Sequence, residues 1–139
     1  GAALAMRQAL QRAGWEADSV DYINLHGTAT QHNDAMESVA VADTLGVTVP
    51  CSSTKPLTGH TLGASGVIEA ALCWITLAEN PCHQLPPHWG DGQADAAMPA
   101  LALVAPGTRL PTAPRRLLSS SFAFGGSNAV LAMEAVGHG

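Results

Sequence analysis

The amino-acid sequence predicts an α/β fold, a mixed five-stranded sheet covered by helices. In the first half of the chain, short strand-like apolar runs alternate with segments of helical periodicity. Near the end, two strand-like runs follow each other across a glycine-containing turn and form a closing pair. With 139 residues, the chain is long enough for one compact domain with its own core, over residues 1–139.

The first predicted helix covers residues 2–13 and ends at Gly14. Its apolar positions recur with the helical period, and we expect four of them to be buried: Leu4, Ala9, Leu10 and Ala13. The alternating pattern of residues 20–25 predicts the first strand, which leads directly to a histidine.

The second predicted helix begins near residues 33–34 and ends at Gly46. Asp34 and Glu37 have the spacing of a capping box at its start. The helix carries four apolar positions, Met36, Val39, Ala40 and Leu45. A short second strand follows at residues 47–52.

The third predicted helix covers residues 63–79, where nearly every side is apolar. We therefore expect a helix that is buried at the centre of the fold. The residues of its first turn are small, which allows close packing or the close approach of a ligand: Gly63, Ala64, Ser65 and Gly66. Pro81 cannot continue the helix and ends it.

The remainder of the chain is expected to be irregular before it returns to the sheet. Residues 81–114 are rich in Pro, Gly and Ala, which favours a surface path with one short strand at 101–104. Two strands at 116–122 and 129–135 then complete the sheet, and the turn between them contains two adjacent glycines.

The composition excludes several classes of partner. Only 12% of the residues are charged, against about 25% in an average soluble domain, so we expect much of the surface to be covered by another surface. A net charge of −5 with six Lys and Arg argues against nucleic acid. The longest apolar run, residues 67–78, contains Glu69 and is too short to span a membrane.

The cysteines and histidines predict neither a disulfide framework nor a metal site. Three cysteines without C-x-x-C spacing, Cys51, Cys73 and Cys82, favour a reducing cytoplasm. The six histidines are scattered, and no pair has the spacing of a metal-binding helix. Cys51 and Cys73 lie within apolar elements and are expected to be inert structural thiols, and Cys82 has no defined base nearby.

Two histidines in glycine-containing loops are the main candidates for chemistry. His26 follows the first strand, and His60 follows the second strand with Lys55 shortly before it. Polar side chains after buried strands are a common place for function in α/β proteins. Either histidine can also be structural, and His60 can simply cap the following helix.

Glu69 is predicted to form an ion pair with Lys55. An unpaired carboxylate inside an apolar helix would cost several kcal/mol, and Lys55 is the nearest cation in sequence. We expect this pair to fix the loop that carries His60, where the helix dipole and the lysine both favour a neutral imidazole. The alternative is that Glu69 points to solvent at the edge of the helix.

Two further loops carry candidate binding groups. The hydroxyls of Thr28 and Thr30 suit an amide or a phosphate-bearing ligand, although they can equally satisfy backbone groups of the turn. The turn containing Phe124, Gly125 and Gly126 can present backbone N–H groups to an oxyanion. No persuasive nucleophile accompanies these groups.

Five motifs occur in one order across almost the whole chain: VDYINLHGTAT at 20–30, NDAME at 33–37, SSTK through GH at 52–60, LGASG through EA at 62–70, and SF through GGSN at 121–128. Together they resemble the C-terminal half of the β-ketoacyl-acyl-carrier-protein synthases, the condensing enzymes of fatty acid and polyketide synthesis. The resemblance implies a thiolase-like half, which is one half of an αβαβα layered fold.

The resemblance also implies a function, a decarboxylative Claisen condensation between an acyl thioester on an enzyme cysteine and a malonyl group on acyl carrier protein. His26 and His60 would promote decarboxylation and stabilise the enolate, and Lys55 with Glu69 would organise His60. Phe124 would be a gating residue whose backbone N–H joins the oxyanion hole. The substrate-binding positions would be Thr28 and Thr30, which contact the phosphopantetheine arm, together with Gly125 and Gly126.

The resemblance further implies what lies outside the chain. The cysteine nucleophile belongs to the N-terminal half of such enzymes, so the expected partners are that half, acyl carrier protein and a second subunit in a homodimer or heterodimer. No cofactor is implied beyond the phosphopantetheine of the carrier. Two residues depart from the family pattern, Ala123 where glycine is usual and Cys51 where a small aliphatic residue is usual.

Two other functions remain open at this point. A chain-length factor is a non-condensing subunit of the same fold, but its two histidines are often altered, whereas both are retained here. An unrelated histidine-dependent hydrolase would need a cysteine or serine positioned by His26, and no strand-to-helix elbow motif supports one.

Overall fold

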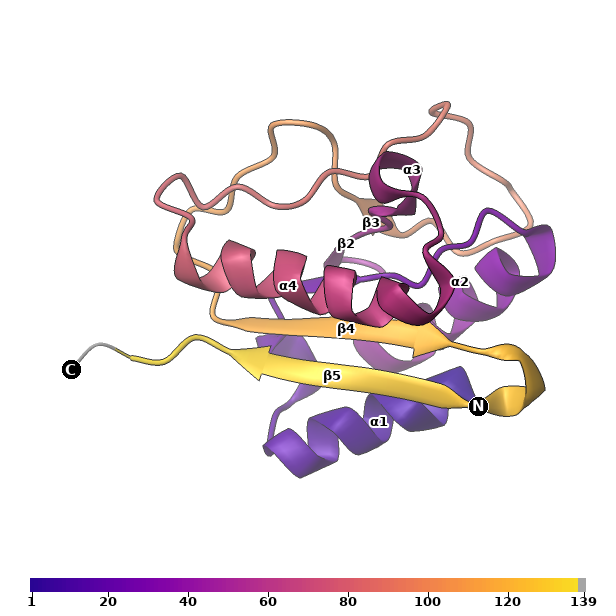
Figure 1. The fold of residues 1–139 in the computed structure, drawn as a ribbon, viewed down its shortest axis with the longest axis horizontal. Coiled ribbons are helices and arrows are strands. Elements are labelled where there is room, and N and C mark those ends of the chain that lie inside the picture. Colours follow the sequence, from indigo (N-terminus) through magenta and orange to yellow (C-terminus); the bar gives the residue numbers. More distant parts are fainter. Residues whose placement is uncertain (138–139) are drawn as a thin grey trace.

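The sheet has the mixed five-stranded architecture that the sequence predicts (Figure 1). The computed structural model describes residues 1–137, with the exception of the side chain of Phe124. The strand order is β3-β2-β1-β4-β5; the first four strands run parallel and β5 is antiparallel to β4. The strands are β1 Tyr22–Asn24, β2 Pro50–Ser52, β3 Ala102–Leu103, β4 Arg116–Phe122 and β5 Asn128–Glu134.

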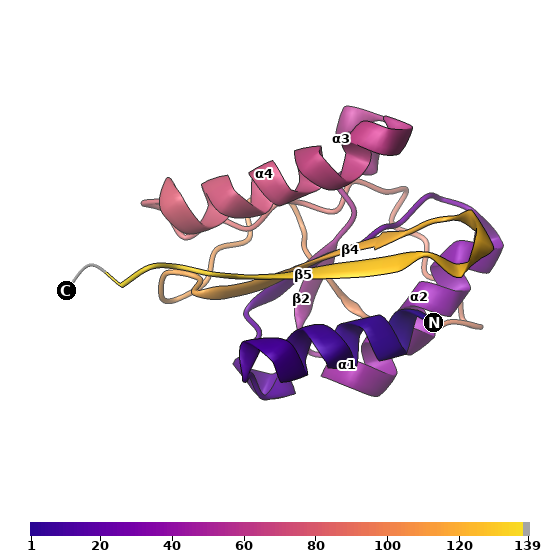
Figure 2. The ribbon, with the colours of Figure 1, turned by 60° about the horizontal axis from the view of Figure 1, so that its bottom comes forward.

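Helices cover both faces of this sheet (Figure 2). The helices α1 (Ala2–Ala13) and α2 (Gln31–Leu45) lie on one face, and α4 (Ser65–Ala78) lies on the other together with the short α3 (Lys55–Thr58). Three single turns of 3₁₀ helix complete the elements, η1 Ala17–Ser19, η2 Leu62–Ala64 and η3 Phe124–Gly126. No helix within residues 1–137 has the length and apolar character needed to cross a membrane.

The main core lies between the sheet and the helices α1 and α2. Its fully buried members include Met6, Ile23, Val41 and Leu118. A smaller cluster lies on the α4 side and contains Tyr22, Cys73, Leu85, Val104 and Leu117. Because both faces of the central strands are buried, β4 carries only apolar and small side chains after Arg116, as is typical of parallel sheets.

The helix α1 has the predicted bounds and the predicted C-terminal glycine. Gly14 adopts a left-handed conformation with φ 71°, and its N–H donates to the last carbonyls of the helix. The expected burial of Leu4 is wrong, since its side chain is 56% exposed. The helix packs on α2 and β5 through Ala2, Met6, Ala9 and Leu10, a face that leaves Leu4 outside and Ala13 at its margin.

The helix α2 begins at Gln31, two to three residues before the predicted start, and no side chain caps it. The capping box predicted for Asp34 and Glu37 is therefore wrong. Glu37 is fully buried, and its carboxylate turns away from the helix terminus toward the loop after β1. Of the four apolar positions, Ala40 and Leu45 are buried, whereas Met36 and Val39 are exposed.

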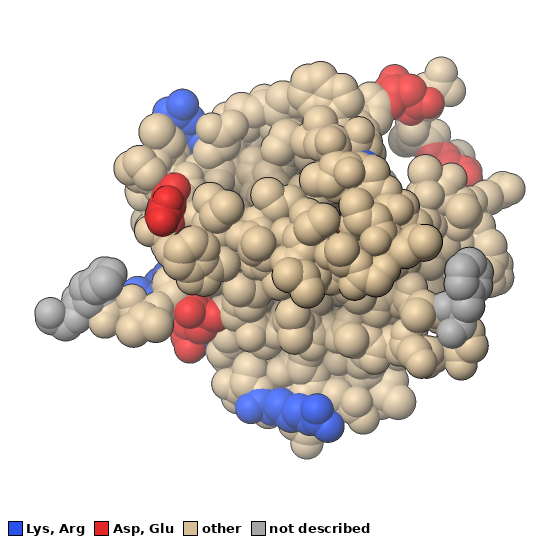
Figure 3. Space-filling model, viewed as in Figure 1, with Lys and Arg blue, Asp and Glu red and all other residues tan. Residues whose placement is uncertain are grey.

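The helix α4 differs most from its prediction, because only one side of it is buried. The side that packs on the sheet carries Ser65, Glu69, Cys73 and Thr76. The opposite side, which we call the α4 apolar face, consists of Val67, Trp74 and Ile75, and Val67 is 73% exposed. Charged side chains lie mainly toward the rim of this view of the molecule (Figure 3). Within residues 1–137, the expectation of a helix enclosed on all sides is therefore wrong.

Candidate active site

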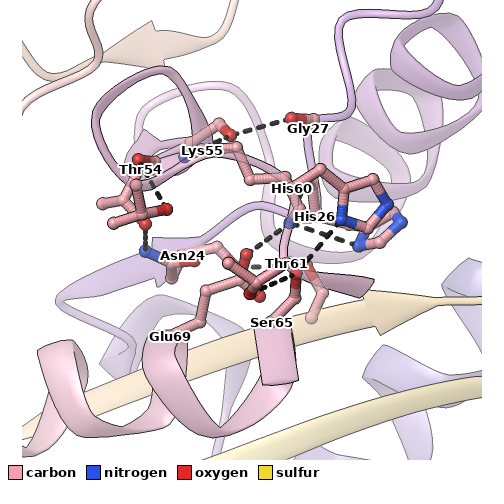
Figure 4. A network of polar contacts seen from close by, with 12 residues as sticks. Asn24, His26, Gly27, Thr54, Lys55, His60, Thr61, Ser65 and Glu69 are labelled. Carbon is pink, nitrogen blue, oxygen red and sulfur yellow. Dashed lines mark hydrogen bonds and ion pairs between the residues drawn. The ribbon is translucent and has the colours of Figure 1, made fainter. Parts of the chain in front are cut away.

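The parallel pairing of β1 and β2 brings the two candidate loops together. Asn24 and Ser52 are register partners at the ends of these strands, and Leu25 N donates to Ser52 O over 2.8 Å. Since parallel strands end at the same edge of the sheet, the residues that follow them lie side by side. His26 follows β1, and Lys55 opens α3 three residues after β2, so both side chains reach one site (Figure 4).

Lys55 is buried and joins three elements through its ammonium group. Its Nζ donates to the backbone oxygen of His26 and to Glu69 Oε1, and it lies 3.4 Å from His26 Nδ1. The Lys55–Glu69 pair that the sequence predicts is therefore present. Among the described residues, no hydrogen bond joins either side chain of this pair to His60: α3 directs the lysine back toward the end of β1, so Nζ meets His26. That the pair fixes the loop carrying His60 stays a prediction.

The pair with Lys55 compensates for the burial of Glu69. Only 2% of the Glu69 side chain and 5% of the Lys55 side chain are exposed. Burial raises the pKa of the Glu69 carboxyl, and the hydrogen bond and charge of Lys55 oppose that shift. Glu69 Oε2 has no hydrogen-bond partner among the described residues, so Lys55 is the main group that favours the charged form of this carboxylate.

His26 is held neutral by its surroundings. Burial, followed by the charges of Lys55 and His60, lowers the pKa of His26 to about 4. An ammonium group has only N–H donors, so the contact with Lys55 makes His26 Nδ1 an acceptor and places the ring proton on Nε2. The ring of Phe122, the last residue of β4, packs against His26 with centroids 5.7 Å apart.

We expect the titration of His26 to reveal this environment directly. With histidine labelled in the ring by ¹³C, the His26 signal of the complete enzyme should stay neutral until the pH approaches about 4. The unfolded chain should titrate near the ordinary value of about 6.5. Because the unfolded state binds the proton first, His26 lowers stability progressively as the pH falls from about 6.5 to 4. A His26→Gln variant assigns the signal, and a midpoint between pH 6 and 7 in the folded enzyme would contradict this account.

His60 lies beside His26 but in a more open position. The two rings meet edge to face, with centroids 5.8 Å apart and an interplanar angle of 87°. His60 is exposed, follows Gly59 at the end of α3 and precedes η2. Its Nδ1 lies 3.1 Å from Ser65 Oγ, at the start of α4. The two histidines from separate loops therefore form one site, as the sequence predicts.

Glu37 supports the His26 loop and was not recognised from the sequence as part of the site. Its carboxylate accepts hydrogen bonds from His26 N at 2.7 Å, Gly27 N at 2.8 Å and Ser120 Oγ at 2.8 Å. Burial raises the pKa of Glu37, and these three donors oppose the shift. Two sequence signals mark it, its acidic type inside helix α2 and its place in the motif at 33–37, but the capping spacing offers a simpler explanation.

His88 and Ser53 stabilise the loop between β2 and α3 through hydrogen bonds. Ser53 N donates to His88 Nδ1 over 3.2 Å, and Ser53 Oγ donates to Gly27 O over 2.9 Å. Burial lowers the pKa of His88, which keeps its Nδ1 available as an acceptor. The segment that the sequence predicts as an irregular surface path thus holds the loop that leads to Lys55, and Ser53 of that loop joins it to the loop carrying His26.

Gly27 is required where these two loops touch. It has φ +40°, and a Cβ atom built on it would lie 2.5 Å from the Cβ of Ser53. Gly27→Ala is expected to lower the free energy of unfolding by about 3 kcal/mol, from left-handed strain and steric overlap together. Gly14→Ala is the matched control, since Gly14 has φ +71° with open space around it and should cost only about 1 kcal/mol. Denaturant unfolding of both variants measures the difference, and equal losses would show that the overlap relaxes.

The predicted binding residues lie on the same side of the fold. Thr28 and Thr30 follow His26, and their hydroxyl oxygens lie 3.1 Å apart at the surface. Gly125 and Gly126 lie in η3, directly after the strand whose last residue contacts His26, and both have φ above +80°. Phe124 begins this turn, but its side chain lies outside the described residues. No hydrogen bond in residues 1–137 links these glycines to the histidines, so their role stays a prediction.

The described part of the chain does not supply a nucleophile to this site. Burial raises the pKa of the Cys51 and Cys73 thiols to about 12, which makes both inert near neutral pH. Cys82 is exposed. Across residues 1–137, no hydrogen bond joins a cysteine sulfur to His26 or His60.

Comparison with known proteins bears directly on this site. Residues 1–89 match the family model described as β-ketoacyl synthase, C-terminal domain. The 3-oxoacyl-[acyl-carrier-protein] synthase 2 of Synechocystis is 38% identical over 138 residues, which is 96% of this chain and 32% of that protein. Nodulation protein E of Rhizobium meliloti is 34% identical over 95% of the chain and 32% of its own length. The chain thus spans about a third of the length of these relatives.

Solved structures show the same relationship. A ketosynthase in complex with its chain length factor from Xenorhabdus doucetiae matches with a TM-score of 0.86 and 43% identity, over 98% of this chain and 33% of that one. A β-ketoacyl synthase from Burkholderia phymatum matches with a TM-score of 0.89 and 35% identity, over 97% and 32%. These likenesses confirm the predicted thiolase-like α/β half.

Proposed function

We propose, from the premise that this chain belongs to the family of β-ketoacyl synthase C-terminal domains, that it is the C-terminal catalytic half of a β-ketoacyl-acyl-carrier-protein synthase. The complete enzyme would carry out the decarboxylative Claisen condensation of an acyl thioester with malonyl-acyl carrier protein, in fatty acid or polyketide biosynthesis. The observation that carries this proposal is the edge-to-face pair of His26 and His60, with the Lys55–Glu69 pair fixing the first of them.

The geometry suits the stabilisation of an enolate. When a malonyl thioester loses carbon dioxide, the electrons of the broken C–C bond form an enolate with negative charge on the thioester oxygen. His26, neutral and protonated on Nε2, is a hydrogen-bond donor to such an oxygen, and the adjacent His60 is placed to provide a second donor. The enolate carbon then attacks the acyl thioester on the enzyme cysteine; a new C–C bond forms and the cysteine thiolate leaves.

The nucleophilic cysteine is proposed to lie in the N-terminal half of the complete enzyme. Two observations support this: the thiols of Cys51 and Cys73 are inert, and the chain spans only about a third of the length of its relatives. We propose that the α4 apolar face packs against that half, because Val67 and Trp74 would otherwise remain exposed to water. The complete enzyme would be a homodimer or a heterodimer, and we propose that it is cytoplasmic.

The proposed substrate path uses the loops next to the histidines. Thr28 and Thr30 would contact the phosphopantetheine arm of acyl carrier protein, since their hydroxyls are near the surface beside His26. Phe124 would gate the site, and the backbone N–H groups of its turn, with Gly125 and Gly126, would line the oxyanion hole. No cofactor other than the carrier's own phosphopantetheine is needed for this chemistry.

The two alternatives are less well supported. A chain-length factor does not need two paired histidines with a buried Lys–Glu pair behind them, and this chain has both. A hydrolase would need an accessible nucleophile beside a histidine, and the serine whose hydroxyl contacts His60, Ser65, is buried. Retention of the whole His–Lys–Glu arrangement therefore favours the condensing subunit.

Reconstitution tests the proposal. Residues 1–139 alone should show no condensation with acyl- and malonyl-acyl carrier protein, and activity should appear when the chain is co-expressed with its N-terminal half. In the complete enzyme, His26→Ala should abolish the release of carbon dioxide from malonyl-acyl carrier protein. Condensation by the isolated chain, or its absence from the complete enzyme, would contradict the proposal. A chain-length factor would show no condensation even as the complete protein.

A further inference from the structure

Ser65 is the first residue of α4, yet its hydroxyl does not cap that helix. The start of α4 makes no side-chain capping hydrogen bond. Instead, Ser65 Oγ lies 3.1 Å from His60 Nδ1 and 3.3 Å from Thr61 Oγ1 (Figure 4). Ser65 is buried whereas His60 is exposed, so the hydroxyl contacts the imidazole from the protein side. Two consecutive hydroxyls thus lead to one nitrogen of a candidate catalytic ring.

Two arrangements of the hydrogens connect these three groups in one continuous chain of donors and acceptors. Each hydroxyl carries one hydrogen, and a neutral imidazole carries one on either nitrogen. In the first arrangement Thr61 donates to Ser65, Ser65 donates to His60 Nδ1, and the ring proton is on Nε2. In the second, Nδ1–H donates to Ser65, Ser65 donates to Thr61, and Nε2 is left without a proton.

We propose that Thr61 and Ser65 are positioning residues that hold His60 in the first arrangement, with its proton on Nε2. The inference rests on the proposed function in one respect, namely that the enolate oxygen requires an N–H donor. Only the first arrangement provides that donor at Nε2, the ring nitrogen for which the described residues offer no hydrogen-bond partner. Neutral hydroxyls thus fix the tautomer of His60, as the Lys55 ammonium group fixes the tautomer of His26.

His26 has a charged neighbour and His60 has neutral ones, and this difference follows from the position of each ring. His26 is buried, and the ammonium group beside it is itself paired with Glu69 inside the protein. His60 Nδ1 is contacted by the hydroxyl of Ser65, which is in turn contacted by the hydroxyl of Thr61, and neither hydroxyl carries a net charge. The tautomer of His60 therefore depends on Ser65 and Thr61, and it is sensitive to the loss of a single hydroxyl.

The tautomer itself can be measured in the complete enzyme by NMR with ¹⁵N-labelled histidine, because protonated and unprotonated ring nitrogens differ in chemical shift. The His60 signals, assigned with His60→Gln, should show the proton on Nε2 in the unmodified enzyme. Ser65→Ala and the nearly isosteric Thr61→Val should give a mixture of tautomers. Thr61→Ser keeps the hydroxyl and is the matched control, which should leave the tautomer unchanged.

Kinetics supply the second measurement. Ser65→Ala should lower kcat for malonyl decarboxylation about 10-fold, the size expected for a misdirected hydrogen-bond donor, with KM unchanged. Transfer of the acyl group to the enzyme cysteine should be unaffected. A proton on Nδ1 in the unmodified enzyme, or an unchanged tautomer in Ser65→Ala, would overturn the inference. A changed tautomer with unchanged decarboxylation would support the hydroxyl assignment and contradict the role of His60 in the proposed function.

Discussion

Glu69→Ala is expected to lower the free energy of unfolding of the complete enzyme by about 3–5 kcal/mol, the usual cost of removing one partner of a buried ion pair. The loss arises because the Lys55 ammonium would remain buried without a counter-charge. Condensation should be lost as well, since Lys55 would no longer be held against His26 Nδ1. Denaturant unfolding and the condensation assay measure the two effects.

A second ion pair within residues 1–137 is the matched control. Arg116 and Glu134 pair across β4 and β5 over 2.9 Å, with side chains that are 35% and 43% exposed. Glu134→Ala should cost less than about 1 kcal/mol, because water and salt screen such a pair. The double substitution Lys55→Met with Glu69→Leu should recover stability without activity. A loss below about 0.5 kcal/mol for Glu69→Ala would mean that the carboxylate is solvated.

His60→Ala is expected to reduce malonyl decarboxylation by about 100-fold, which is the cost of removing one donor from an oxyanion site. Acyl transfer to the enzyme cysteine should change by less than about 3-fold, because that step creates no enolate. Release of carbon dioxide and formation of the acyl-enzyme can be followed separately in the complete enzyme. The selectivity of the loss, more than its size, identifies the role of the ring.

A histidine outside the site provides the control for this prediction. His83 follows the C-terminal end of α4, whereas His60 precedes its N-terminal end, and no hydrogen bond joins the His83 side chain to the site residues among those described. His83→Ala should leave both steps unchanged. If His60→Ala slows decarboxylation and acyl transfer equally, His60 supports the fold of the site and does not act on the enolate.

The parts of the fold with a regular pattern could be predicted from the sequence. The bounds of α1 and β4, and the sheet that places His26 and Lys55 at neighbouring strand ends, follow from periodicity and turn residues. The Lys55–Glu69 pair could be predicted because an apolar helix leaves a carboxylate few alternatives. In each case the relevant information lies within a short stretch of sequence.

The remaining features depend on contacts between distant segments. Glu37 binds backbone N–H groups, which every residue has, so no partner residue marks its role in the sequence. Lys55 contacts His26, distant in sequence, instead of the nearby His60, because the parallel strands decide which loops meet. The α4 apolar face was predicted as core, since composition cannot distinguish packing on the same domain from packing on another surface.

The burial of the Lys55–Glu69 pair has a consequence for the ionic strength at which the enzyme works. Dissolved ions screen charges that contact water, over about 8 Å at physiological ionic strength, but they do not enter the protein interior. With side chains 5% and 2% exposed, this pair keeps its strength in concentrated salt, and the neutral form of His26 persists there. An effect of salt on turnover would therefore report on the proposed encounter with acyl carrier protein and not on the Lys55–Glu69 pair or the charge state of His26.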